Sequence, residues 1–294
     1  MPANRYQDWE SFKFPAGSPA GGPAGGLVAF CADLSPASVL GAYRRGVIPL
    51  PAPDEYFRTL NEVRYEDEVA AGAIAVVGDR GDPYWAAWWS PDPRPVIGAG
   101  GVHLGRNVRK RLRRDGLRTT ANAAFGQVAE ACRAGREPRW LTDALLGSLT
   151  ELHHQGWAHS VEVWLDEDLV GGAMGIGVGG VLSGDSLFGR RPGAAAIAVA
   201  DLRARLEAAG GTIVDAQWDS PFLRSLGAAP IARERYLELL GPPGEPVALP
   251  TCSLPALRLL PQPLAGGAAP PYRPGARALE GTQIPLALAT AAVK

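Results

Sequence analysis

HSVEVWLDEDLVGGAMGIGVGGVLSGD, residues 159–185, is the stretch that decides the fold. It is rich in β-branched and apolar residues, which predicts strands, and two short breaks divide it. The first break is an acidic turn at 166–168 and the second is the glycine pair at 179–180. The expected strands are 161–164, 169–177 and 181–185. Because each connection is so short, the stretch predicts a meander of neighbouring strands.

A helix and a further strand are expected after the meander. Residues 194–209 carry apolar side chains at helical spacing, and Gly210-Gly211 ends that helix. The side of this helix expected to face inward carries Ile197, Leu202 and Leu206. The side expected to face outward carries Arg203, Arg205 and Glu207. Residues 212–218 read as the next strand. A meander, a helix and a strand together indicate an α+β or α/β fold with a mixed sheet.

Upstream of the meander the sequence predicts three helices. Ser35 can cap a helix that has Pro36 in its first turn, runs to Arg45 and stops at Gly46. A very basic helix is expected at 106–114. A third is expected at 143–155, where Thr142 caps the start and three leucines share the inward face: Leu145, Leu149 and Leu152.

The chain is expected to have four parts. Residues 1–26 form a flexible N-terminus, and 27–94 form a small N-terminal α/β domain. That domain contains a polar insert at 52–84 without clear periodicity. Residues 95–245 form the catalytic domain, and 246–294 form a C-terminal extension that is a loose tail or a strap over the body.

Composition excludes several classes of protein. The 294 residues carry a net charge of −1, and 46% are hydrophobic, which is enough for a sizeable core. No apolar run has the length of a membrane span, so no membrane association is expected. Cys31, Cys132 and Cys252 lie far apart without metal or redox spacing, which favours a reduced, cytoplasmic setting.

A run of seven cations lies between residues 106 and 118, against the single acid Asp115. A charge run is usually a solvated helix face, and that interpretation stays open. One carboxylate cannot neutralise the run, however, so binding to an RNA backbone is the other interpretation. The residues expected to bind such a backbone are Arg106, Arg109, Lys110 and Arg113.

Two glycine motifs match patterns that bind phosphate in other proteins. Residues 175–180 match G-x-G-x-x-G, but a strand follows instead of the helix that dinucleotide binding needs, so a hairpin turn is expected. Residues 190–195 match the R-x-x-G-x-A loop of acetyl-CoA-dependent acetyltransferases, and a helix does follow. A plain helix entry with two surface arginines is the alternative.

The histidines and Ser186 give no strong signal. His153, His154 and His159 lack a metal-binding spacing, so structural or surface roles are expected, and no metal is predicted. Ser186 lies in G-D-S and not in a nucleophile elbow.

Asp215 and Gln217 form a candidate polar site. They stand two apart in the strand expected at 212–218, so both side chains should emerge on one face. A charged Asp in an apolar strand is costly without a partner. The alternative is that Asp215 only bonds neighbouring backbone.

Several ordered blocks resemble the leucyl/phenylalanyl-tRNA–protein transferase family. Besides the meander and the 213–217 strand, these are Asp33-Leu34-Ser35-Pro36, Ala42-Tyr43-Arg44-Arg45-Gly46, the run from Trp88 to Arg94, Ala124-Phe125-Gly126, and Trp140-Leu141-Thr142. The likeness spans residues 27–55 and 86–245.

The resemblance implies a catalytic domain like that of GNAT acyltransferases and a small N-terminal domain. Members of the family move Leu or Phe from aminoacyl-tRNA to the N-terminal Arg or Lys of a protein. The ester is already activated, so no cofactor is implied beyond aminoacyl-tRNA as co-substrate. By resemblance, Asp215 polarises Gln217, whose carbonyl accepts a hydrogen bond from the attacking amine. Asp185 and Ser186 fall in the acceptor-binding region, and Trp140, Leu50 and Phe188 in the aminoacyl and adenosine pocket.

The sequence departs from the family near the expected substrates. Leu50 replaces a stacking tryptophan, and Asp185 replaces a glutamate one methylene longer. The insert at 52–84 and the C-terminal extension are also additional.

Four functions stay open at this point. The first is aminoacyl transfer to a protein N-terminus. The second is the same chemistry on a small cationic metabolite in antibiotic biosynthesis or self-protection, and the third is a CoA-dependent N-acetyltransferase. The fourth is a non-enzymatic tRNA-binding protein. A monomer is expected.

Overall fold

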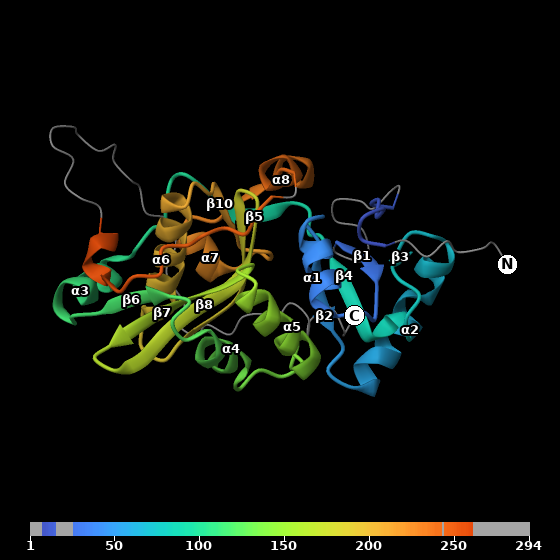
Figure 1. The fold of residues 1–294 in the computed structure, drawn as a ribbon, viewed down its shortest axis with the longest axis horizontal. Helices are drawn as coiled ribbons and strands as arrows, with labels where there is room; N and C mark the ends of the chain where they lie inside the picture. The colour runs from blue at the N-terminus through green and yellow to red at the C-terminus, as the bar shows by residue number, and fades with distance from the viewer. Residues whose placement is uncertain (1–7, 16–25, 243, 261–294) are drawn as a thin grey trace.

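A computed structural model describes residues 8–15, 26–242 and 244–260. It is a mixed α+β structure with two sheets, one of four strands and one of eight. Figure 1 shows the smaller sheet at one end of an elongated molecule and the larger sheet at the other. The fold class predicted from sequence, a mixed α+β structure, is confirmed.

The four-stranded sheet is built from residues 27–89 in the order β2-β4-β1-β3. Its strands are β1 (Leu27–Phe30), β2 (Ile48–Pro51), β3 (Ala75–Val76) and β4 (Ala86–Trp89). Helix α1 (Pro36–Tyr43) begins as expected, since the Ser35 side chain accepts a hydrogen bond from the Ser38 backbone N–H. Its packing against α5 joins this part of the chain to the rest.

The polar insert contains a long helix. Within 52–84, α2 (Glu55–Ala70) is followed by β3 and by the short helix η1 (Pro83–Trp85). Asp54 caps α2 through the Phe57 N–H at 3.1 Å, and only Tyr65 of the helix is buried. Because so little of α2 meets the core, its sequence lacks the apolar period that would have predicted it.

The eight-stranded sheet has the order β11-β5-β10-β9-β8-β7-β6-β12, and β10 runs parallel to β9 while the other pairs are antiparallel. The meander is confirmed as β7 (Ala158–Leu165), β8 (Asp168–Val178) and β9 (Val181–Gly189). The other strands are β5 (Arg94–Ile97), β6 (Arg118–Ala121), β10 (Ile213–Asp215), β11 (Ala229–Ile231) and β12 (Leu254–Pro255).

Helices cover both faces of this sheet. Helix α6 (Ala194–Ala208) packs on β7, β8 and β9, and α4 (Phe125–Arg133) contacts the same strands; their side chains belong to different core clusters. The remaining helices are α3 (Arg106–Arg114), α5 (Asp143–His154), α7 (Pro221–Ser225), α8 (Arg233–Leu240) and η2 (Ala256–Leu259). The three leucines expected on the inward face of α5 are buried.

Two terminal segments pack on the body. Trp9 and Phe12 are buried in the core cluster that includes Trp88, so residues 8–15 are not the surface segment expected from sequence. The large apolar area of these two aromatic side chains is the physical reason. Residues 1–7, 16–25 and 261–294 lie outside the described residues. The part of the extension at 247–260 is a strap, because β12 pairs with β6 and Val247 and Leu249 are buried.

Candidate active site

Asp215 ends strand β10 and forms a fully buried ion pair with Arg94. Both side chains have 0% exposure. Arg94 Nε donates to both carboxylate oxygens at 3.1 and 3.0 Å, and Nη2 donates to Oδ2 at 2.6 Å. Burial lowers the pKa of Arg94, but the Asp215 charge, the hydrogen bonds to Asp215 and the nearby Tyr236 and Tyr43 together outweigh burial, and the net pKa lies above its usual value. Asp215 is therefore a fixed carboxylate whose cationic partner comes from the adjacent strand β5.

The same guanidinium connects to the four-stranded part of the molecule. Arg94 Nη1 donates to the Gly46 carbonyl at 2.9 Å, just after α1. The Tyr236 ring of α8 lies under the guanidinium, 4.3 Å from its carbon. Since one guanidinium meets β10, α8 and the segment after α1, these elements are held in fixed register around Asp215.

Gln217 is not part of a strand, so the expected alternation of Asp215 and Gln217 along one strand is wrong. Strand β10 stops at Asp215, and Gln217 has a left-handed φ of 60°. The physical reason is local: Asp215 Oδ1 accepts the Gln217 backbone N–H at 2.8 Å and turns the chain. The two residues still belong to one site, through this turn and not through strand geometry.

The turn directs the Gln217 carboxamide toward β9. Its Nε2 donates to Ser183 Oγ at 2.9 Å and to Asp185 Oδ1 at 2.5 Å, and Ser183 Oγ donates to the same Asp185 oxygen at 2.8 Å. These bonds fix which end of the amide is nitrogen. No described residue bonds Gln217 Oε1, so that oxygen is the free acceptor of the group.

Asp185 stands on a bulge of β9. In the register with β8, Ser186 pairs with Met174 and Gly184 with Gly175, which leaves Asp185 without an opposite residue. A bulge re-aims a side chain, and it lets Asp185 reach the Ser183 hydroxyl. Gly175 is required here, because a Cβ on it would lie 1.5 Å from the Ser183 carbonyl oxygen.

Burial raises the pKa of Asp185 to about 7. Hydrogen bonds from Ser183 and Tyr43 oppose the shift, Asp215 adds to it and Arg94 reduces it. Burial, followed by the Asp185 charge, raises the pKa of Tyr43 well above its usual value. Asp185 Oδ2 is buried without a hydrogen bond of normal geometry to any described residue. Asp185 is thus a carboxyl group that changes charge near neutral pH inside the site.

The other expected acceptor residue, Ser186, lies next to Asp185 but bonds elsewhere. It is buried, and its hydroxyl accepts a hydrogen bond from Arg136 Nη1 at 2.9 Å. Phe188 is half-buried two residues further along β9, with the Arg190 guanidinium 5.4 Å from its ring centroid. Phe188 and Ser186 follow each other on one face of the strand.

The two remaining pocket residues come from other parts of the fold. Trp140 is half-buried ahead of α5 and packs against the same core cluster as Phe188. Leu50 is half-buried in β2, opposite Ala87 of β4. No contact given by the structure joins Leu50 to Gln217 or Asp185, so its place in a pocket stays a prediction.

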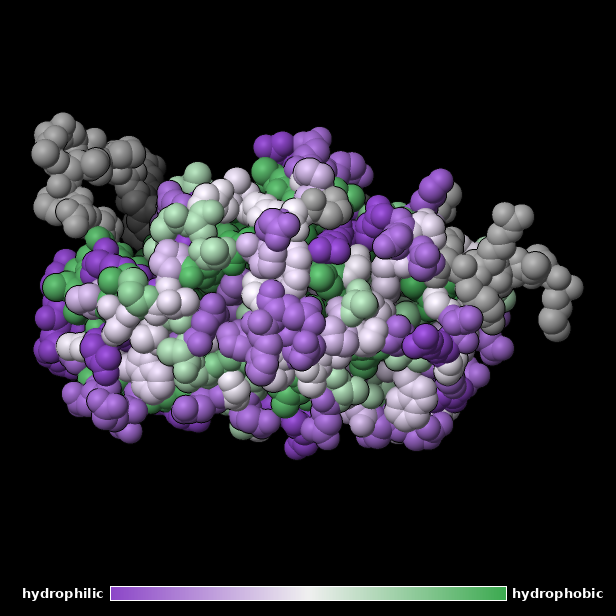
Figure 2. Space-filling model, viewed as in Figure 1, coloured by the Kyte–Doolittle hydropathy of each residue, from purple (hydrophilic) through white to green (hydrophobic). Residues whose placement is uncertain are grey.

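The expected tRNA-binding side chains lie on helix α3, which forms as predicted. All four are exposed and none has an ion pair with a described residue: Arg106, Arg109, Lys110 and Arg113. Asp115 instead pairs with Arg111 and Arg114. Val108 and Leu112 pack inward on the core, and Figure 2 shows hydrophilic residues gathered at the end of the molecule where Figure 1 places α3.

The two glycine motifs have different structures. Residues 175–180 form the end of β8 and the turn into β9, which confirms the hairpin. At 190–195, β9 is followed by α6, which begins after Gly193 at a φ of 85°. A Cβ on Gly193 would lie 3.0 Å from Val108 Cγ2, so close packing against α3 accounts for that glycine.

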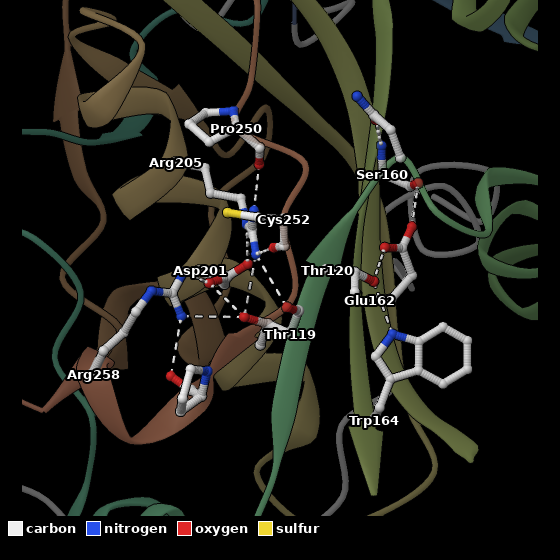
Figure 3. Close-up of polar contacts among 12 residues, drawn as sticks. Thr119, Thr120, Ser160, Glu162, Trp164, Asp201, Arg205, Pro250, Cys252 and Arg258 are labelled. Atoms are coloured by element: carbon white, nitrogen blue, oxygen red, sulfur yellow. Dashed lines mark hydrogen bonds and ion pairs between the residues drawn. The ribbon is translucent and has the colours of Figure 1, made fainter. Parts of the chain in front are cut away.

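Arg203 and Arg205 are buried, so the expectation that they face solvent is wrong. Arg205 Nε donates to Asp201 Oδ2 at 2.7 Å, and its Nη2 donates to the Cys252 carbonyl at 3.0 Å. The strap at 247–260 covers this side of α6, which the 3.6-residue period of the helix cannot reveal. Figure 3 shows the network, in which Arg258 also binds Asp201.

A second polar network lies on the opposite face of the same strands (Figure 3). The fully buried Glu162 accepts hydrogen bonds of 2.5 Å from Ser160 Oγ and from Thr120 Oγ1, and Trp164 Nε1 donates to Thr120. Thr119 and Thr120 are adjacent on β6 and belong to the two different networks. Both networks tie strands together and lie apart from the Gln217 turn.

His153 and His159 have structural surroundings, as expected. His153 stacks on Phe125 with ring centroids 4.2 Å apart. Burial lowers the pKa of His159 to about 4, and its Nδ1 lies 3.1 Å from Asn122 Nδ2. Within residues 8–15, 26–242 and 244–260 there is no cluster of three His, Cys, Asp or Glu suited to a metal ion. The same ranges contain no helix that could cross a bilayer.

Sequence reasoning missed four residues of the site: Tyr43, Arg94, Ser183 and Tyr236. One signal for Arg94 was present, because a buried Asp requires a cationic partner and Arg94 begins an apolar strand. The others become visible only through contacts between distant segments.

Comparisons with known proteins show the family of this chain. Residues 96–241 match the family model described as leucyl/phenylalanyl-tRNA protein transferase. A protein of that name from Chromohalobacter salexigens is 39% identical over 243 residues, which cover 82% of this chain and 81% of the relative. Relatives of the same name from Proteus mirabilis and Edwardsiella ictaluri are 36% and 35% identical and cover 79% and 87% of the chain, and 89% and 94% of their own lengths. The chain therefore belongs to the leucyl/phenylalanyl-tRNA–protein transferase family.

Proposed function

We propose that this protein transfers a hydrophobic aminoacyl group, of the leucine or phenylalanine type, from aminoacyl-tRNA to the α-amine of an N-terminal Arg or Lys. Membership of the family supports the reaction. The observation that carries it to this chain is the fixed carboxamide of Gln217, whose Nε2 is held by Ser183 and Asp185. A carboxamide held in this way presents its oxygen to an incoming N–H donor.

The proposed chemistry is positioning rather than strong acid–base catalysis. Gln217 Oε1 accepts a hydrogen bond from the acceptor amine and aligns its lone pair on the ester carbonyl carbon. The amine attacks, and the tetrahedral intermediate collapses with release of the tRNA 3′ oxygen. The amine loses one proton and the ribose hydroxyl gains one, so the transfer needs no net acid or base.

Asp215 acts as a positioning residue in this scheme. Its carboxylate holds the Gln217 backbone N–H at 2.8 Å, while Arg94 holds the carboxylate. The chain of contacts Arg94–Asp215–Gln217 fixes the turn and hence the direction of the carboxamide. No cofactor is required in the proposal, because the aminoacyl ester is already activated.

We infer that residues 95–245 form a GNAT-like acyltransferase domain and that 27–94 form the smaller N-terminal domain. An antiparallel β7–β8–β9 meander followed by α6 and a parallel β10 supports the first inference. A separate four-stranded sheet supports the second.

The basic face of α3 is the proposed contact for the tRNA backbone. Four of its exposed cations have no carboxylate partner in the part of the chain that the structure describes, so they can neutralise phosphates: Arg106, Arg109, Lys110 and Arg113. Such contacts position an RNA without reading its sequence. Each relative named above is called a protein transferase, and no observation favours a metabolite or acetyl-CoA as substrate.

The test is a filter assay with radiolabelled leucyl-tRNA and a peptide that begins with Arg. The expected result is label in the peptide, in a form stable to the mild base that releases the amino acid from tRNA. A peptide of the same composition with a blocked N-terminus is the control. Absence of label with leucyl-, phenylalanyl- and methionyl-tRNA would overturn the proposal.

A further inference from the structure

Arg136 lies on the loop between α4 and α5 and has no role in the proposed reaction steps. Its guanidinium is half-buried and held by two neutral oxygens: Nη1 donates to Ser186 Oγ at 2.9 Å and Nη2 donates to the Leu187 carbonyl at 2.6 Å. It takes part in no ion pair with any described residue. Burial lowers its pKa, and the only charge-bearing neighbour that opposes this is the Cys132 thiol.

That thiol cannot supply the missing negative charge. Burial raises the pKa of Cys132 to about 11, so the group is neutral at physiological pH. A cation partly withdrawn from water without a countercharge is costly, and ionisable groups perturbed in this way cluster at sites that bind ligands. Two of the five guanidinium N–H groups are used, and the others have no partner among the described residues.

The position of Arg136 places this charge beside the proposed site. Ser186, to which Arg136 is bonded, directly follows Asp185, and Asp185 bonds Gln217. Ser183 and Ser186 pair with Ile176 and Met174, whose side chains belong to one core cluster, so both serines lie on the same face of β9. The guanidinium is therefore on the face of β9 that carries Asp185 and Phe188.

We propose that Arg136 binds a backbone phosphate near the 3′ end of the aminoacyl-tRNA. This inference rests on the proposed function. An N-terminal Arg or Lys acceptor is cationic and would be repelled, whereas the donor brings phosphates close to its reactive ester. The planar fork of a guanidinium pinned at two nitrogens matches phosphate oxygens. Phe188 lies on the same face of β9, with the Arg190 guanidinium 5.4 Å from its ring centroid.

The decisive experiment compares two small donors, 3′-O-leucyl-adenosine and its 5′-phosphate, with an Arg-initiated peptide as acceptor. For the unaltered protein we expect kcat/KM to be about tenfold or more higher with the phosphorylated donor, as for a charge-assisted hydrogen bond. In Arg136→Gln, which can still bond Ser186, the preference should vanish while the rate with the phosphate-free donor stays within about twofold. Arg136→Lys should restore part of the preference. Arg139→Gln, an exposed arginine three positions along, is the matched control.

An equal loss with both donors in Arg136→Gln would show a structural role and overturn the proposal, as would an absence of preference in the unaltered protein. A second measurement does not require transfer at all. Filter binding gives the slope of log tRNA affinity against log salt concentration. In Arg136→Gln this slope should become shallower by about 0.7, the value for one lost single-strand phosphate contact. An unchanged slope would contradict the proposal, even if transfer to the peptide, and hence the proposed function, had failed separately.

Discussion

Gln217 Nε2 donates a 2.5 Å hydrogen bond to Asp185 Oδ1, across the gap between the end of β10 and the bulge of β9. The bond joins a carboxamide held in a left-handed turn to a carboxyl group that titrates near neutral pH. It brings together two residues that lie 32 positions apart in the sequence.

Gln217→Ala removes the acceptor oxygen and should lower kcat by about 10²–10³-fold, the range for loss of one positioned hydrogen-bonding group at a reacting centre. Affinity for leucyl-tRNA should stay within about twofold, because the proposed backbone contacts lie on α3. Single-turnover transfer and filter binding measure the two effects. A variant that loses tRNA binding in proportion to activity would contradict a positioning role.

The pH profile of transfer should contain the ionisation of Asp185. The charged carboxylate accepts the two hydrogen bonds at Oδ1 more strongly than the neutral acid does, so kcat/KM should fall as pH drops through about 7. Asp185→Asn should abolish that part of the fall and leave the ionisation of the acceptor amine, at about 7.7–8.0. Tyr43, Asp215 and Arg94 face the same carboxyl, so Tyr43→Phe is the control that alters one neighbour without removing the titrating group.

The same group links stability to pH. Its pKa is raised on folding from 3.8 to about 7, so the folded state holds the proton more tightly than the unfolded state. Its contribution to the free energy of unfolding should therefore decrease as pH rises from about 4 to 7, by at most about 1.4 kcal/mol per pH unit. Urea unfolding of Asp185→Asn across that window should lack this contribution; an identical slope in the two proteins would count against it.

Asp215→Asn leaves Arg94 as a buried, unpaired cation and should destabilise the protein by about 3–5 kcal/mol. The double variant Arg94→Met with Asp215→Leu should recover part of that loss, since neither charge is then buried alone. Arg224 forms an ion pair with Asp219 in which both side chains are exposed, and Arg224→Ala should cost less than about 1 kcal/mol. Denaturant midpoints at constant m-value give all three numbers, and equal losses at the two pairs would refute the argument from burial.

Gly175→Ala should disrupt the bulge, because its Cβ would overlap the Ser183 carbonyl oxygen at 1.5 Å. We expect a loss of more than about 2 kcal/mol, together with reduced transfer, as the backbone shifts at Ser183 and Asp185. Gly147→Ala on α5 is the matched control: a Cβ there meets nothing within 4 Å, and Ala should stabilise the helix by up to about 1 kcal/mol. Thermal unfolding and the peptide assay test both variants.

Neutralising the exposed face of α3, with Gln at each of its four unpaired cations, should weaken tRNA binding and flatten its salt dependence by about 0.9 for each lost duplex phosphate contact. The rate of transfer from 3′-O-leucyl-adenosine, which lacks the acceptor stem, should not change. A quadruple variant with an unaltered salt slope would remove α3 from the RNA interface.

The sequence by itself determined the elements whose signal is local. The β7–β9 meander, the capped helices α1 and α5 and the basic helix α3 were all readable, because hydrophobic period, turn residues and capping side chains act over a few residues. Family likeness further indicated Asp215, Gln217 and Asp185. The local sequence pattern did not predict the burial or the partners of side chains that are covered by distant segments of the chain. Arg205 is buried where the strap at 247–260 lies over α6, and Asp215 pairs with an arginine 121 residues away. The turn at Gln217 follows from a local hydrogen bond of its backbone N–H to Asp215, while tertiary structure holds Asp215 in place through Arg94 and so sets the direction of the carboxamide.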